Sequence, residues 1–239
     1  MDENCIAKAH VLDEDFLMLA AQELWNRWLP DKFSLHRLED MLEDYLDNDP
    51  DQRILERFLA IWTAIREHVL IPYKCLSFDQ FEEKTDFPYA MDAVFFDTIP
   101  DMVNECRNRQ EEDPESWDRL IMLYRDMMEH LTDMQEENKL NLRRSYAEAH
   151  FYKGDTNTAD ELFKKLIEEH PDWVWGYIGW GDLYNPRFSD SPAGDKDEAL
   201  RLYRLGLDKV SSDRAILEDR IEELTNRLRS CKRGNFPLF

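Results

Sequence analysis

Two short glycine-containing turns, each set between apolar patterns of helical period, constrain the fold of this chain more than any other feature of its sequence. Gly154-Asp155 separates an apolar pattern that begins at Leu140 from a second pattern that ends at Pro171. The second pattern repeats at the i, i+3, i+4, i+7 and i+8 positions, which is the spacing of one helix face. Because two helices joined by so short a turn pack antiparallel, residues 140–172 predict a helical hairpin.

The same arrangement recurs directly afterwards. A helical pattern from Gly176 to Tyr184 is followed by the turn Gly194-Asp195 and by an apolar stripe that ends at Leu207. Repeated hairpins stack on their neighbours and present an extended surface rather than a reaction centre. The sequence therefore predicts an all-α fold of antiparallel helical hairpins stacked as an α-solenoid, and it favours a binding role.

The remaining sequence also predicts helices, separated by prolines and acidic turns. We expect them over residues 13–28, 34–46, 51–70, 90–108, 114–131 and 212–228. Ser34 and Ser212 are suitable N-cap residues. Pro72 is expected to end the third of these helices, and Pro100 to kink or divide the fourth. Residues 73–90 have the weakest periodicity, so a possible domain break is placed near 72–90.

The charge of the chain limits the kinds of partner that it can bind. Its 52 acidic residues outnumber 30 basic ones, which gives a formal net charge of −22. Such a chain repels nucleic-acid phosphates and anionic membranes, so the prediction is a protein or peptide partner with a basic segment, and no nucleic acid or membrane. Solubility alone is an equally good explanation of the same charge.

The cysteines and the N-terminus indicate a cytoplasmic protein. The four cysteines, Cys5, Cys75, Cys106 and Cys231, are dispersed, which is typical of a reducing compartment and argues against a disulfide framework. The first residues are acidic where a secretory signal would be basic, and no apolar run approaches the roughly 18 residues of a membrane span.

Motifs that carry catalysis or bind cofactors are missing. The only glycine cluster, Gly176, Gly179 and Gly181, has the wrong order for a dinucleotide site, so we interpret it as close helix packing. His36 and Asp40 share a helix face, but a surface His–carboxylate contact explains that pair better than a metal does. We therefore expect no catalytic residue, no metal and no cofactor.

The two C-terminal hairpins resemble tetratricopeptide (TPR) repeats, which are 34-residue helical hairpins. With Leu140 as position 1, the small, glycine, alanine, aromatic and proline positions of that pattern are Ala147, Gly154, Ala159, Phe163 and Pro171. With Val174 as position 1, Gly181 fits at once, Gly194, Ala199 and Tyr203 fit after a six-residue insertion, and Ser211 replaces the closing proline. Residues 173–184 also resemble a bacterial group of TPR-like proteins, some of which carry a SEC-C metal-binding tail that this chain lacks.

This resemblance implies both a domain plan and a binding surface. We expect an N-terminal helical region at 1–135, TPR-like hairpins with a capping helix at 136–230 and a tail at 231–239. In TPR proteins four positions of each first helix line a concave groove. Here those positions are Asn141, Arg144, Glu148 and Phe151, then Trp175, Ile178, Asp182 and Asn185. The implied function is a non-catalytic scaffold whose acidic groove binds a peptide or helix of a partner.

Two other functions remain open, together with one mode of regulation. The first alternative is that residues 1–135 form an enzymatic or ligand-binding domain with a TPR-like appendage. The second is that the helix over 212–228 pairs with a second copy, although we favour a monomer in which it covers the end of the stack. The C-terminal bases, including Arg220, are expected to compete with a basic ligand for the acidic groove. A frayed terminus is the alternative to that competition.

Overall fold

The computed structural model describes residues 16–233 except positions 18, 26, 30, 31, 48–52, 86 and 190. The chain divides into two compact units, Met1–Asn48 and Asp49–Phe239. In the first unit, residues 16–28 are helical at every described position, and helix α2 spans Leu35–Asp47. The backbone N–H of Arg37 donates to Ser34 Oγ at 3.2 Å, so Ser34 caps α2 as predicted.

The second unit begins with a helix that runs past the proline expected to end it. Helix α3 (Ile54–Ile65) passes into a π-helical turn, η1 (Arg66–Leu70), and then into α4 (Ile71–Tyr73). The prediction that Pro72 ends the helix is therefore wrong. In the π turn the N–H of Ile71 bonds to the carbonyl of Arg66, five residues earlier. This wider turn changes which carbonyl faces the proline ring, so the helix continues until Lys74 adopts a left-handed conformation at φ 54°.

The next three helices fill the remainder of the N-terminal region. They are α5 (Phe78–Thr85), α6 (Met91–Asn108) and α7 (Ser116–His130). Pro100 does not divide α6, because it lies on the exposed side of that helix, where the loss of one backbone hydrogen bond is least costly. The possible break near 72–90 falls inside the second unit, and α5 packs against α6.

Two helical hairpins and a final helix complete the chain. Their elements are α8 (Glu136–Lys153), α9 (Thr156–Glu169), α10 (Val174–Tyr184), α11 (Lys196–Leu207) and α12 (Arg214–Arg233). Gly154 ends α8 at φ 96°, and the carboxylates of Asp155 and Asp195 accept backbone N–H groups at the starts of α9 and α11. Both turns therefore form where the sequence predicted them.

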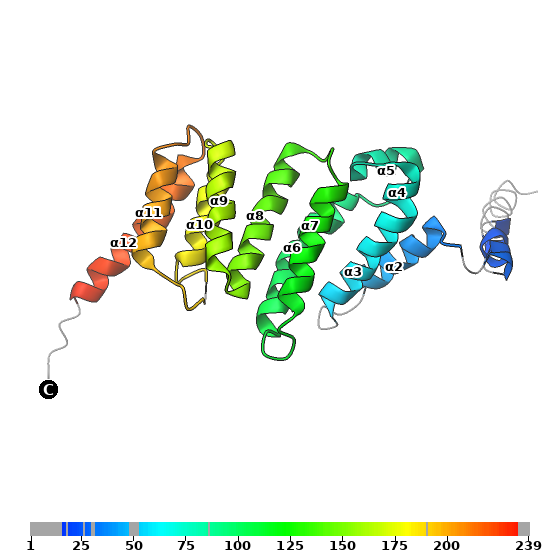
Figure 1. The fold of residues 1–239 in the computed structure, drawn as a ribbon, viewed down its shortest axis with the longest axis horizontal. Helices are drawn as coiled ribbons and strands as arrows, with labels where there is room; N and C mark the ends of the chain where they lie inside the picture. Colours follow the sequence, from blue (N-terminus) through cyan, green and yellow to red (C-terminus); the bar gives the residue numbers. More distant parts are fainter. Residues whose placement is uncertain are drawn as a thin grey trace, which may run out of the picture. The chain divides into compact units, whose positions relative to one another are not determined.

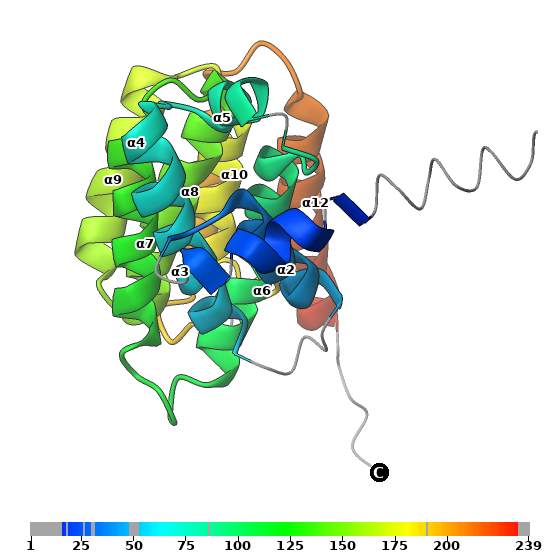
Figure 2. The same cartoon turned by 90° about the vertical axis from the view of Figure 1, so that its right-hand side faces the viewer.

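The helices of the second unit pack in chain order (Figure 1, Figure 2). Helix α7 packs on α8, α8 on α9, α10 on α11, and α11 on α12, while α8 also contacts α10. Every regular element among the described residues is helical. The prediction of an all-α fold of hairpins stacked as a solenoid is confirmed.

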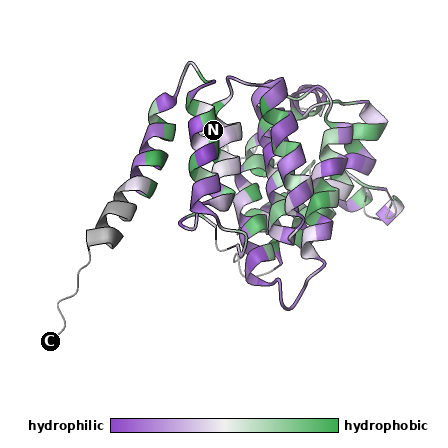
Figure 3. Cartoon of the chain, turned by 60° about the vertical axis from the view of Figure 1, so that its left-hand side comes forward, coloured by the Kyte–Doolittle hydropathy of each residue, from purple (hydrophilic) through white to green (hydrophobic). Residues whose placement is uncertain are grey.

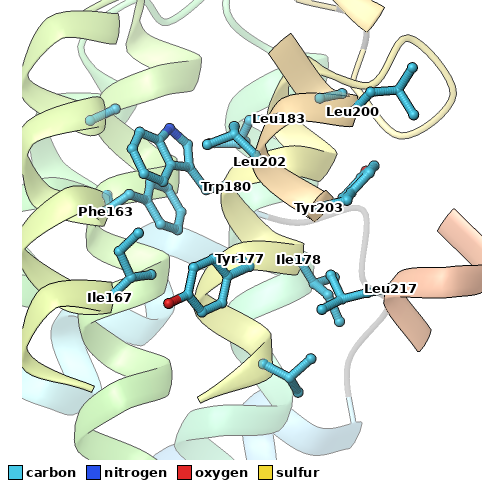
Figure 4. Close-up of a cluster of buried hydrophobic side chains, with 14 of the residues drawn as sticks. Phe163, Ile167, Tyr177, Ile178, Trp180, Leu183, Leu200, Leu202, Tyr203 and Leu217 are labelled. Atoms are coloured by element: carbon cyan, nitrogen blue, oxygen red, sulfur yellow. The ribbon is translucent and has the colours of Figure 1, made fainter. Parts of the chain in front are cut away.

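A core of aliphatic and aromatic side chains joins the C-terminal hairpins (Figure 4). Phe163 of α9 stacks on Trp180 of α10, with ring centroids 5.9 Å apart and planes 6° apart. The Asp160 carboxylate accepts hydrogen bonds from Trp180 Nε1 at 2.7 Å and from the Tyr184 hydroxyl at 2.8 Å. Each large side chain buried in such a core contributes about 2 kcal/mol, and the polar atoms at the ring edges are satisfied.

The three clustered glycines are sites of close helix packing, as predicted. A Cβ at Gly176 would lie 3.0 Å from Ile167, one at Gly179 would lie 2.7 Å from Arg144, and one at Gly181 would lie 2.3 Å from the Tyr203 ring. Helix α10 therefore approaches α9, α8 and α11 more closely than side chains at these positions would allow.

Helix α12 covers the end of α11 with one apolar face, as Figure 3 shows in green against the purple polar side. Leu217 and Leu224 on that face are buried. The prediction that Ser212 caps this helix is wrong: its hydroxyl donates to the Asp213 carboxylate at 3.0 Å, and the helix begins at Arg214.

We expect Gly154→Ala to lower the free energy of unfolding by about 1 kcal/mol. An alanine meets no neighbour within 4 Å at this site, so the whole effect comes from the strained positive φ. Asparagine tolerates that conformation better, so Gly154→Asn should lose less. Urea denaturation of both variants measures the difference. Equal losses would mean that the backbone conformation is not what requires glycine.

Candidate functional site

The predicted groove positions meet where α8 and α10 lie side by side. Gly179 of α10 makes the contact possible, because a Cβ there would lie 2.7 Å from Arg144 Cδ and 3.2 Å from Glu148 Oε1. The two α8 side chains lie over the glycine. Arg144 Nε is 3.3 Å from Glu148 Oε1, and both side chains are only about a quarter exposed (25% and 23%).

Asp182, one turn further along α10, has stronger partners than Glu148. The Tyr203 hydroxyl of α11 donates to Asp182 Oδ1 at 2.5 Å. Arg220 of α12 binds both carboxylate oxygens, with Nε 3.0 Å from Oδ1 and Nη2 3.3 Å from Oδ2. This two-bond geometry is the strong form of an arginine–carboxylate contact. We call Glu148, Asp182, Arg144 and Arg220 the acidic cluster, because its carboxylates belong to the predicted groove.

The loop between α10 and α11 also contacts the Arg220 guanidinium. The guanidinium carbon lies 4.2 Å from the centroid of the Phe188 ring, a cation–π distance. Arg187 Nη1 pairs with Glu223 of α12 at 3.1 Å and so fastens the loop to that helix. Arg220 is thereby held between a carboxylate and an aromatic face, and it is 24% exposed.

Both carboxylates of the acidic cluster have raised pKa values. Burial is the main cause of the raised pKa at Glu148, Arg144 opposes it, and the charge of Asp182 adds to it. Burial is also the main cause of the raised pKa at Asp182, which the bonds from Tyr203 and Arg220 counteract. The cluster therefore holds two partly desolvated carboxylates, each paired with one arginine of the same chain.

We expect Glu148→Gln to stabilise the protein at neutral pH. A carboxyl whose pKa is raised on folding contributes stability below its ordinary pKa of 4.5 and loses it as pH rises through the folded value. Glutamine has the shape of the protonated form, so the variant should unfold at a higher temperature than the parent at pH 7. The gain should vanish below pH 4.5. Thermal unfolding across this pH range measures the difference, and a lower melting temperature at pH 7 would mean that the Arg144 contact outweighs the burial.

The structure brings together only part of the predicted groove set. Glu148, Asp182 and Arg144 form the acidic cluster described above. Asn141 is half-buried, and Trp175 is 40% exposed on α10.

Three other residues of the predicted groove set are buried. Phe151 and Ile178 belong to the hydrophobic core. Asn185 is buried, donates to the Tyr203 hydroxyl at 3.2 Å and accepts from the Arg187 N–H at 3.1 Å. These three residues are buried and do not line an open surface.

Two side chains of the site were not anticipated from the sequence, namely Tyr203 and Phe188. Tyr203 occupies an aromatic packing position of the TPR pattern. That pattern predicts a buried ring and gives no indication that the hydroxyl contacts Asp182. Phe188 lies in the insertion that interrupts the pattern. Arg220 was anticipated, because a basic C-terminal segment follows an acidic face. Its contact with Asp182 is the closest agreement between sequence and structure at this site.

A histidine–carboxylate pair and two buried thiols lie outside the acidic cluster. Among the described residues, no three or more His, Cys, Asp or Glu side chains are arranged to hold a metal ion. His36 Nδ1 lies 3.0 Å from Glu39, and its Nε2 lies 3.6 Å from Asp40. Cys75 and Cys106 are buried thiols, and burial raises the pKa of Cys106 to about 11. No described helix is both long and apolar enough to cross a membrane.

A hollow of about 810 Å³ lies between the start of α3 and the end of α6. Nine of the ten described residues that line it are polar or charged. Glu105 accepts the N–H of Leu55 at 2.8 Å and an N–H of Arg109 at 3.1 Å, while Arg53 pairs with Glu56 at 3.0 Å. Several of its charged groups therefore satisfy one another.

Comparison with protein-family models, with curated proteins and with solved structures finds no match to this chain.

Proposed function

We propose that the protein is a non-catalytic interaction module whose acidic cluster binds an arginine-bearing segment of a protein partner. One observation carries the proposal: this chain already places a guanidinium, that of Arg220, on Asp182 and against the Phe188 ring. The neighbouring Glu148 has only a single-atom contact with Arg144, at 3.3 Å. A partner arginine would replace Arg220 on Asp182, with the Glu148 carboxylate beside it.

The raised pKa values of Glu148 and Asp182 support this role. Charged groups that are stabilised incompletely lower the stability of the free protein, and proteins retain them where a ligand later compensates the charge. The same property predicts the pH dependence of binding. Both carboxylates must be ionised to hold an arginine, so affinity should rise as the pH increases above 4.5, the ordinary glutamate value. Salt should weaken the complex.

The test is an array of 12-residue peptides with a central arginine, each printed beside a version in which citrulline replaces that arginine. Citrulline keeps the shape and loses the charge. We expect full-length protein to bind a subset of arginine peptides and none of the citrulline versions. Binding of both versions, or of acidic peptides only, would reject the proposed function.

Capture of the partner from lysate is then compared between two double charge-reversal variants, to show whether the acidic cluster is the binding surface. Glu148→Lys/Asp182→Lys should lose the partner. The control Glu137→Lys/Glu161→Lys changes the net charge equally at exposed positions of α8 and α9 and should retain it. Truncation after Ser230 leaves Arg220 in place, so Arg220→Ala is the variant that opens the cluster. It should capture more partner than the parent chain does.

We propose that the chain acts as a monomer in this role. The apolar face of α12 that a second copy would need is occupied by its own α11, with Leu217 and Leu224 buried. Light scattering should give a mass near 28.7 kDa. A dimer that persists on dilution would show that another surface self-associates.

The 810 Å³ hollow between α3 and α6 favours a second candidate function, binding of a small polar ligand. Asn104 and Asp101 line this hollow, and a thermal-shift screen of charged metabolites tests it. A ligand whose stabilising effect is lost in Asn104→Ala, and kept in Glu148→Gln, would establish this function instead.

A further inference from the structure

We propose that a second binding site lies between α9 and α11, and that it takes an acidic peptide segment with a bulky apolar anchor residue. Helices α9 and α11 both pack against α10, and a cleft of about 500 Å³ separates them. Ile167, Tyr177 and Trp180 line this cleft, and Figure 4 shows all three in the core beneath it. The proposal is independent of the acidic cluster on α8 and α10.

The floor of the α9–α11 cleft is apolar even though it contains a tyrosine and a tryptophan. The Tyr177 hydroxyl donates to the Pro171 carbonyl at 3.0 Å, and Trp180 Nε1 donates to Asp160 at 2.7 Å. Both polar atoms are therefore satisfied within the chain, and an apolar ligand group placed over the rings leaves no hydrogen bond unmade. Leu205 of α11 and Ile167 of α9 add aliphatic walls.

The rim of the cleft is basic, which is unusual in a chain of net charge −22. Lys164, Arg201 and Lys209 line it, against one carboxylate, Glu168. Arg201 is engaged by Glu198 through two bonds of 2.8 and 2.6 Å. Lys164 forms a long ion pair of 4.0 Å with Glu168, and no ion pair joins Lys209 to another described residue. Lys209 is therefore available to an acidic ligand, and Lys164 can turn towards one at little cost; this charge complementarity selects an acidic segment.

The dimensions of the cleft fit a short stretch of polypeptide. Its lining runs from Lys164 on α9 to Pro171, just beyond the end of that helix, which is about 10 Å at the helical rise per residue. An extended peptide covers that length with about three residues. One large apolar side chain of the ligand would contact the floor over Tyr177 and Trp180. Acidic residues before and after it would lie near Lys164 and Lys209 on the rim.

Three acetylated and amidated hexapeptides test the site by fluorescence anisotropy on the full chain. The first, Glu-Asp-Leu-Phe-Glu-Glu, has both required features, the second replaces Leu-Phe with Ala-Ala, and the third replaces every acid with Lys. We expect the first to bind at least about tenfold more tightly than the other two. Equal binding of the first two peptides would show that the apolar floor does not recognise the ligand. Failure of the first peptide to bind at millimolar concentration would overturn the proposed site.

Two single charge reversals on α9 test whether the first peptide binds in the cleft. Lys164 and Lys165 are neighbours on α9 with the same side-chain exposure of 68%, and each faces a glutamate one turn away, but only Lys164 lines the cleft. Lys164→Glu should weaken the first peptide about tenfold, and Lys165→Glu should leave it within about twofold. Equal losses would show diffuse attraction and reject the cleft. Loss on Leu205→Ala with retention in Glu148→Gln/Asp182→Asn would separate this site from the acidic cluster.

Discussion

Replacing Gly181 with alanine is expected to lower the free energy of unfolding by about 2 kcal/mol. A Cβ at this position would lie 2.3 Å from Cε1 and 2.7 Å from Cδ1 of Tyr203, well inside contact distance. The ring cannot move aside easily, because Tyr203 is fully buried and its hydroxyl is bonded to Asp182 and Asn185. Overpacking of this kind costs about 3 kcal/mol, and the better helix propensity of alanine returns about 1 kcal/mol.

Gly179→Ala is the matched control for this prediction. It makes the same change on the same helix, but its new Cβ would meet the flexible Arg144 side chain at 2.7 Å. Arg144 can rotate away, so the gain in helix propensity should leave stability unchanged to within about 1 kcal/mol. Urea denaturation monitored by circular dichroism measures both variants. If Gly181→Ala is no more destabilising than Gly179→Ala, the contact between α10 and α11 is looser than described.

Neutralising both carboxylates of the acidic cluster is expected to weaken binding of the tightest arginine peptide about 100-fold. Glu148→Gln/Asp182→Asn keeps the shape of both side chains and removes only their charges. Each lost charge-assisted contact to a guanidinium is worth about 1.4 kcal/mol, a factor of ten, and the two losses combine. Isothermal titration calorimetry gives the affinities.

Stability and binding should move in opposite directions in this double variant. Burial raises the pKa of both groups, so their neutral replacements should raise the melting temperature at pH 7 while they lower the affinity. The control Glu137→Gln/Glu161→Gln removes two exposed charges from α8 and α9 and should change affinity by less than about threefold. A similar loss in the control would mean that the peptide recognises overall charge and not the cluster.

The helices were predictable from sequence because their local signals agree. The turn at Gly154-Asp155 supplies both the positive φ that ends α8 and the carboxylate that caps α9. The prediction that Pro72 ends its helix was wrong because, although proline generally ends helices, a π turn precedes it here and the helix continues. The prediction for Ser212 was wrong because the helix begins at Arg214, and the Ser212 hydroxyl donates to the carboxylate of its neighbour Asp213.

The site was only partly predictable, because periodicity does not distinguish a groove position from a core position. Phe151 and Ile178 fall at the same helical spacings as Glu148 and Asp182, and the additional packing from neighbouring helices decides which of them is buried. The cleft between α9 and α11 had no sequence signal at all. Its floor belongs to the core pattern, and its lysines are dispersed, Lys164 on α9 and Lys209 in the turn after α11.

The account as a whole depends on whether a partner arginine takes the place of Arg220. The N–H signal of Arg220 Nε in an NMR spectrum reports this directly, because that N–H now donates to Asp182 Oδ1 at 3.0 Å. The signal is assigned by its disappearance in Arg220→Lys, and the protein is titrated with the tightest arginine peptide. We predict that the signal moves to the position of a solvent-exposed arginine with the same midpoint as peptide binding. Peptide binding that leaves the Arg220 signal unmoved, with unchanged affinity in Arg220→Ala, would contradict the proposal that the two arginines share one site.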